Sequence, residues 1–142
     1  MSVNLSKDQQ ISLSKSDGST LIYVRMGLGC QAAPRKGFLA KLTGAREIDL
    51  DASAVLCASR QIADVVFFQH LTSDDGSVRH TGDNLTSGAE LARYTLTGGG
   101  NHTAQIMAKV HRTGDTWQMK AIGEPATGRT FQDLLPSIAP HL

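Results

Sequence analysis

Apolar and polar residues alternate along much of the chain, and helical periodicity is almost absent. The stretch "REIDLDASAVL", residues 46–56, shows the alternation most clearly. Since a strand repeats every two residues, one of its faces is apolar and is formed by Ile48, Leu50, Ala52, Ala54 and Leu56. The other face begins with Glu47, Asp49, Asp51 and Ser53. We therefore expect a strand over roughly 46–58 that carries two neighbouring aspartates.

Other short runs predict further strands. "QISLSK" (10–15) and "LIYVRMGLG" (21–29) flank the turn signal "SDGS" and predict a hairpin. An apolar run at 63–71 predicts a largely buried strand, and 102–123 predicts two strands around "TGD". The stretch 89–97 fits a helix or a strand, and the last apolar residues predict a short helix or turn packed on the body: Leu134, Leu135 and Ile138.

The number of short strands bounds the fold class. Seven or eight strands separated by turn signals favour an all-β sandwich or barrel. A length of 142 residues suggests one domain over 1–142, long enough to bury a core without disulfides.

Composition and charge argue against several kinds of partner and cellular location. The formal net charge is +1 and no long basic run exists, so nothing in the composition suggests nucleic acid or an anionic membrane as partner. The first residues lack the pattern of a secretory signal, and no apolar run approaches the length of a membrane helix. We therefore expect a cytoplasmic protein in which Cys30 and Cys57 are reduced thiols, although sequence alone does not show whether they meet.

The acidic residues raise the question of a cation site. Asp49, Asp51 and Ser53 resemble the start of a helical calcium loop, but Ala54 and Arg60 stand where that loop requires Gly and Glu. A second group of hard oxygens follows in "GDNLTSGAE", residues 82–90, and such oxygens suit calcium better than zinc or copper. Composition alone is equally typical of a solvated strand face and a polar turn.

The order and spacing of these motifs are similar to a known family. "IDLDASAVL" followed by "DVVFFQHLTSDDGSVRHTGDNLTSG" resembles the TerD domain family of tellurium-resistance and stress-response proteins. The resemblance covers most of the chain and implies a two-sheet β-sandwich with a short C-terminal helix or turn. It also implies calcium as a cofactor, bound between loops, with ligands at Asp49, Asp51, Asp83, Asn84 and Glu90.

Two departures from the family pattern weaken the calcium expectation. After "GDN" the family continues with a Gly-rich stretch and a cluster of acidic residues, whereas "LTSGAELARYTL" is shorter and keeps only Glu90. Calcium affinity falls with the number of charged ligands, so we expect at most a weak, partly degraded site. Cys30 stands where the family usually has Trp.

Three functions remain open from the sequence. The first is a non-enzymatic stress-response module that binds an unknown protein or small ligand, with calcium rigidifying its loops. The second is a metal-free interaction scaffold. The third is a hydrolase that uses the paired carboxylates as acid and base, but no motif positions a nucleophile. The five histidines are scattered without zinc-site spacing, and the sequence does not predict an oligomeric state.

Overall fold

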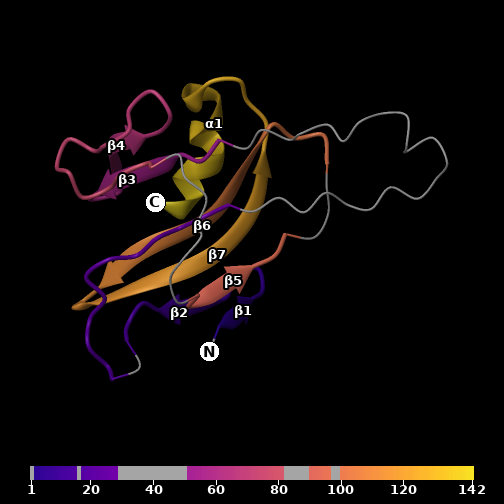
Figure 1. The fold of residues 1–142 in the computed structure, drawn as a ribbon. Coiled ribbons are helices and arrows are strands. Elements are labelled where there is room, and N and C mark those ends of the chain that lie inside the picture. Colours follow the sequence, from indigo (N-terminus) through magenta and orange to yellow (C-terminus); the bar gives the residue numbers. More distant parts are fainter. Residues whose placement is uncertain (1, 16, 29–50, 82–89, 97–99) are drawn as a thin grey trace, which may run out of the picture. The chain divides into compact units, whose positions relative to one another are not determined.

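The computed structural model describes residues 2–15, 17–28, 51–81, 90–96 and 100–142 (Figure 1). The chain divides into two compact units. Unit 1 combines Met1–Val24 with Ser87–Leu142, and unit 2 is Arg25–Thr86. Unit 2 is thus inserted, in sequence, between the two parts of unit 1.

A long antiparallel hairpin dominates unit 1. It is formed by β6 (Ala104–Thr113) and β7 (Thr116–Ala126), which run side by side in Figure 1. Thr113 pairs with Thr116 around a two-residue loop in which Gly114 has φ +60, a conformation that favours glycine. The two strands predicted around "TGD" are therefore confirmed.

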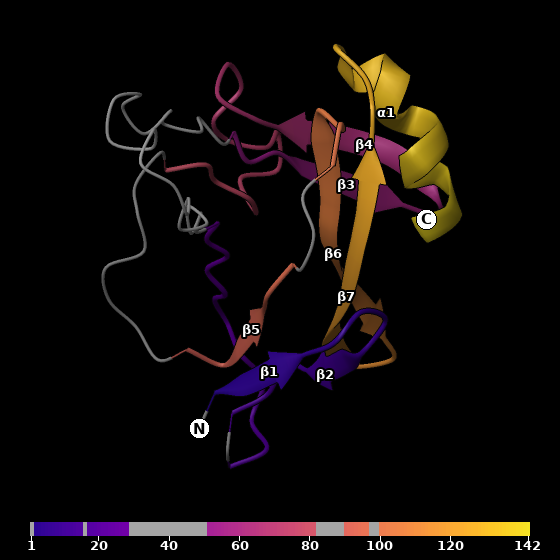
Figure 2. The same cartoon turned by 90° about the vertical axis from the view of Figure 1, so that its right-hand side faces the viewer.

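Two short N-terminal strands pair with distant partners in the same unit. β2 (Gln10–Ser12) adds to the free side of β7 in antiparallel orientation, which gives a sheet of order β2-β7-β6. β1 (Val3–Leu5) pairs in parallel with β5 (Ala92–Tyr94), as Figure 2 shows. The ambiguous stretch 89–97 thus contains a strand.

The helix of unit 1 follows directly on β7. α1 (Phe131–Ile138) contacts β6 and β7, and a 3-10 turn, η2 (Ala139–His141), completes the chain. A capping box starts α1, because Thr130 accepts from the backbone of Asp133 while the Asp133 carboxylate accepts from the backbone of Thr130. The predicted C-terminal helix is confirmed. The buried apolar residues of unit 1 are Leu5, Leu13, Ala121, Ile122 and Ala126.

Unit 2 contains a hairpin of β3 (Ala54–Ala58) and β4 (Gln61–Val66). Ser59 and Arg60 form its loop, and both have positive φ, as the turns that match strand twist require. The register shifts between Leu56 and Cys57, and the Cys57 side chain is exposed. Val66 is the buried apolar residue of this unit among the described residues.

Several predicted strands are shorter than expected, and one is wrong. Residues 21–28 form no strand, and Ile22 is 96% exposed. The hairpin around "SDGS" is reduced to a single bridge between Ser14 and Thr20, and Gln10–Ser12 pairs with β7. An alternating pattern indicates which face of a strand is buried, but it does not determine which other strand pairs with it.

Two predicted strands also have boundaries that differ from those in the structure. The strand predicted over 46–58 begins at Ala54 in the described part, with residues 51–53 outside it, and residues 46–50 lie outside the described residues. The strand predicted over 63–71 ends at Val66, because Phe67 and His70 exchange backbone hydrogen bonds in a tight turn.

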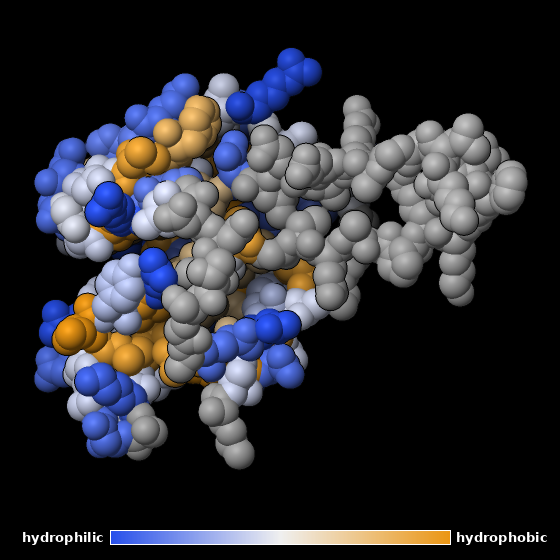
Figure 3. All heavy atoms as spheres, in the orientation of Figure 1, coloured by the Kyte–Doolittle hydropathy of each residue, from blue (hydrophilic) through white to orange (hydrophobic). Residues whose placement is uncertain are grey.

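Strands outnumber helices throughout the described residues, so the β-rich fold class is confirmed. The single domain over 1–142 stays a prediction. No helix in the described ranges is long and apolar enough to cross a membrane. Apolar side chains interrupt the polar surface seen in Figure 3, and the exposed ones in unit 1 include Val3, Val110 and Trp117.

Candidate functional site

The residues expected to bind calcium fall into three groups. Asp49, Asp83 and Asn84 lie outside the described residues. Asp51 belongs to unit 2, where its exposed side chain precedes β3. Glu90 belongs to unit 1, two residues before the start of β5. The five-residue calcium set therefore stays a prediction.

The Glu90 carboxylate already has protein partners. Arg93 binds it with Nη2 at 2.7 Å from Oε2 and Nε at 3.3 Å from Oε1, and the Ser2 hydroxyl donates to Oε1. The Arg93 guanidinium, followed by the Ser2 hydroxyl, lowers the pKa of Glu90. Both carboxylate oxygens are thus engaged by donors, which compete with a cation for the same lone pairs.

A different group of potential metal ligands lies in unit 2. One donor atom each from Asp64, His70 and Asp74 lies within 4.8 Å of the other two. The His70 Nε2 atom is 3.4 Å from Asp64 Oδ1 and 4.0 Å from Asp74 Oδ1. The side chains are 18%, 39% and 92% exposed for Asp64, His70 and Asp74 respectively. These residues together can hold one metal ion.

Two consecutive turns bring these ligands together. Asp64 is on β4, and the turn in which Phe67 and His70 bond each other's backbone at 2.9 Å places His70 back beside it. The chain then makes a second hairpin, in which Thr72 bridges Arg79 and the Ser73 amide donates to the Val78 carbonyl. Asp74 lies in the turn of that second hairpin.

The Asp64 carboxylate links β4 to the turn of the second hairpin. Its Oδ2 accepts from the Asp74 amide at 2.9 Å, and its Oδ1 accepts from the Val65 amide at 2.7 Å. The Asp74 amide is the main cause of the lowered pKa of Asp64, with the Val65 amide and the His70 imidazole adding to it. Asp64 is therefore held as a carboxylate in a fixed orientation.

The next aspartate has a structural role. Asp75 Oδ1 accepts from the Ser77 amide, the Ser77 hydroxyl and the Ser73 hydroxyl. These donors, Ser77 foremost, lower the pKa of Asp75 to about 2. Gly76 follows with φ +70, a conformation that favours glycine in turns.

Sequence reasoning missed the Asp64, His70 and Asp74 group. The histidines were judged to lack metal-site spacing, and spacing rules for zinc sites rest on ligands within one turn or helix. Here five residues lie between Asp64 and His70 and three between His70 and Asp74, and the chain makes two turns over this stretch. Asp75-Gly76 is a common turn pair in sequences. The tight turn at Phe67–His70, in contrast, contains no Gly, Asn or Pro from which it could be predicted.

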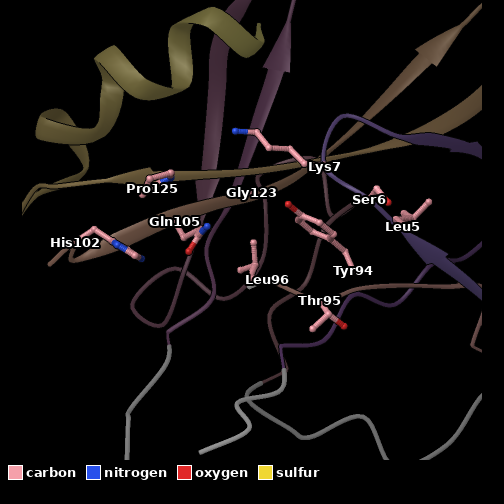
Figure 4. A pocket seen from close by; sticks show the side chains of 10 residues that line it. All are labelled: Leu5, Ser6, Lys7, Tyr94, Thr95, Leu96, His102, Gln105, Gly123 and Pro125. Carbon is pink, nitrogen blue, oxygen red and sulfur yellow. The ribbon is translucent and has the colours of Figure 1, made fainter. Parts of the chain in front are cut away.

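Unit 1 contains a hollow of about 530 Å³. Figure 4 shows its side chains, which come from the ends of β1 and β5 and from β6 and β7. Tyr94 points toward Gly123, whose φ of +64 and missing side chain let the phenol lie against the backbone. The lining residues are Leu5, Ser6, Lys7, Tyr94, Thr95, Leu96, His102, Gln105, Gly123 and Pro125.

Comparison with known proteins gives a consistent family. The model of the TerD domain matches residues 1–90 and again residues 84–137. The chain is 31% identical over 183 residues to tellurium resistance protein TerZ of Serratia marcescens, with 93% of this chain and 94% of that protein covered. No solved structure matches the chain.

Other relatives match a shorter part. Tellurium resistance protein TerD of Serratia marcescens is 47% identical over 90 residues, which are 61% of this chain and 42% of that protein. Stress response protein SCP2 of Bacillus subtilis is 37% identical over 92 residues, covering 61% of this chain and 46% of that protein. The chain thus spans less than half the length of these two relatives.

The alignment with TerZ also shows that this chain lacks part of that protein. It extends over 183 positions although the chain has 142 residues, so TerZ contributes at least 41 positions with no counterpart here. The two matches to the family model meet at residues 84–90, the region where the family's acidic cluster was expected and only Glu90 remains. The resemblance inferred from the motifs is confirmed, and the chain belongs to the TerD domain family.

Proposed function

We propose that this chain is a non-enzymatic stress-response module of the tellurium-resistance type, which acts by binding a protein or a small ligand. The observation that carries the proposal is the family match on both sides of residues 84–90, across nearly the whole chain. Relatives named for tellurium resistance and for stress response support the same role. Within this proposal we expect the strands to form the family's two-sheet sandwich.

The proposed module has at most a weak calcium site, for which Asp49, Asp51, Asp83, Asn84 and Glu90 are the expected ligands. Two observations support a low affinity of this site for calcium. TerZ has at least 41 positions that this chain lacks, and the Glu90 carboxylate is engaged by Arg93 and Ser2. Each lost carboxylate removes both a ligand oxygen and a negative charge, which lowers affinity for calcium.

Titration calorimetry with calcium, paired with thermal melts, tests the site. We expect a dissociation constant in the millimolar range, of order 10⁻³ M, as in weak calcium modules. At tenfold excess over that constant the folded state gains about 1.4 kcal/mol, which a melt detects as a rise in Tm. Asp51→Asn should remove both the heat and the rise.

A matched variant separates specific binding from charge screening. Asp115 is a fully exposed carboxylate in the β6–β7 loop, so Asp115→Asn changes the net charge equally and should leave the calcium response intact. Equal loss in both variants, or no response in the wild type at 10 times the expected constant, about 10 mM, contradicts the calcium site.

The second candidate is a metal-free scaffold that has lost the family's calcium sites. The ion pair of Glu90 with Arg93 favours it, because the guanidinium competes with a calcium ion for the same carboxylate oxygens. Affinity capture of a partner in the presence and absence of chelator distinguishes the two. A partner that stays bound in chelator supports the scaffold, and one that is released supports the calcium module.

A further inference from the structure

We propose that Asp64, His70 and Asp74 bind one divalent transition-metal ion, of the zinc or cobalt class. The site lies entirely in unit 2 and shares no residue with the expected calcium set. It is therefore independent of the function proposed above.

The distances between the donor atoms suit one small ion. A tetrahedral zinc ion with ligands at about 2.1 Å holds neighbouring donor atoms about 3.4 Å apart. The His70 Nε2 atom is 3.4 Å from Asp64 Oδ1 and 4.0 Å from Asp74 Oδ1. The first distance already fits, and a small rotation of the exposed Asp74 side chain closes the second.

The His70 Nε2 atom has only a weak contact with the protein, because its nearest carboxylate oxygen, Asp64 Oδ1, lies 3.4 Å away. This nitrogen is shielded from solvent and makes no hydrogen bond within the described residues. A shielded polar atom without a partner costs free energy. The two aspartates face this nitrogen, so an ion between the three groups would satisfy the imidazole and both carboxylates together.

Two of the three ligands are positioned before any ion arrives. The Val65 and Asp74 amides orient the Asp64 carboxylate, and the turn at Phe67–His70 fixes the backbone of His70. Asp74 is 92% exposed and supplies the mobile third ligand. Preorganisation of this kind lowers the entropy lost when the ion binds.

The donor set selects the class of ion. Two carboxylates with one neutral imidazole carry a charge of −2, which balances a divalent cation. Calcium takes six to eight oxygen ligands and gains little from an imidazole, whereas zinc and cobalt accept nitrogen readily. Three protein ligands leave a fourth tetrahedral position for water or for a group from a bound partner.

The test is titration of the full chain with Zn²⁺, followed by calorimetry and by ¹⁵N NMR of the histidine imidazoles. We expect saturable binding of one ion and a shift of the His70 Nε2 resonance. His70→Gln and Asp74→Asn should each weaken binding by roughly tenfold or more, the loss typical of disrupted metal sites. The Asp74 side chain is exposed and its amide remains in place, so Asp74→Asn should fold normally.

His111→Gln is the matched control. His111 also has a shielded ring nitrogen without a hydrogen bond, but among the described residues no carboxylate forms an ion pair with it. The control should bind Zn²⁺ as the wild type does. Wild-type affinity in both His70→Gln and Asp74→Asn, an unmoved His70 resonance, or displacement of Zn²⁺ by equimolar Ca²⁺ would overturn the proposal.

Discussion

Single carboxylates hold several turns of this chain. Asp17, Asp75 and Asp133 each accept hydrogen bonds from donors within four residues, and these contacts lower the pKa of all three. The Ser19 hydroxyl, followed by the Ser19 amide, is the main cause for Asp17, whereas backbone amides are the main cause for Asp75 and Asp133. Such aspartates are the ones that sequence composition predicts correctly, since they act on their own neighbours. Asp64 differs, because one of its oxygens reaches the amide of a residue ten positions away.

The lowered pKa of Asp75 makes the stability of its turn depend on pH. Its carboxylate is stabilised in the folded state, so its contribution is present above the ordinary value of 3.8 and is lost as pH falls toward about 2. In NMR titration of the carboxyl carbons, Asp75 should titrate near the low end of that window. Ser77→Ala removes one donor and should move the pKa upward, whereas an Asp75 that titrates at 3.8 in the wild type contradicts the turn geometry.

Gly123 combines a left-handed backbone with close contact to Tyr94. A Cβ at this position would overlap the Tyr94 hydroxyl, and φ is +64. Gly123→Ala should therefore lower the free energy of unfolding by about 1 kcal/mol for backbone strain and by a further 1–3 kcal/mol for overlap, measured by urea denaturation. Gly114→Ala is the control, because Gly114 has φ +60 with nothing near its Cβ. Equal losses in the two variants would show that the Tyr94 contact is not formed.

At the scale of elements, predictions from local sequence signals were correct, but the sequence did not predict which strands pair with each other. The β6–β7 hairpin was predicted from its turn signal "TGD", and the C-terminal helix or turn from the local apolar residues Leu134, Leu135 and Ile138. The strand predicted at 21–29 was wrong, since alternation in "LIYVRMGLG" says nothing about an available edge. β2 found its edge on β7, more than a hundred residues away along the chain.

The cap of α1 offers a test at this scale. Thr130→Ala removes the side-chain oxygen that accepts from the Asp133 amide and should cost ~1 kcal/mol in the free energy of unfolding. Thr130→Ser keeps an oxygen in the same place and should retain most of the stability. Chemical denaturation of both variants checks this, and an equal loss in Ser and Ala would rule out a capping role.

At the scale of the whole molecule, family membership was predicted from the sequence and is confirmed, whereas the calcium site stays a prediction. The motifs around Asp49, Asp51, Asp83 and Asn84 identify the family, and the shortened stretch before Glu90 predicted a reduced calcium site. The Asp64, His70 and Asp74 group could not be predicted. It depends on a turn at Phe67–His70 that no turn-forming residue marks, and only folded backbone brings its ligands together.

The pairing of β1 with β5 and of β2 with β7 bears on how the chain is made. Val3 pairs with Ala92 and Gln10 with Lys120, so the strands synthesised first find their partners only when most of the chain has been translated. Until then their unpaired edges are open to neighbouring chains, and closing such long loops is entropically slow. The β6–β7 hairpin needs only a two-residue loop, and it can offer the β7 edge as a template for β2. We therefore expect the β6–β7 hairpin of unit 1 to form before β1 and β2 find their partners.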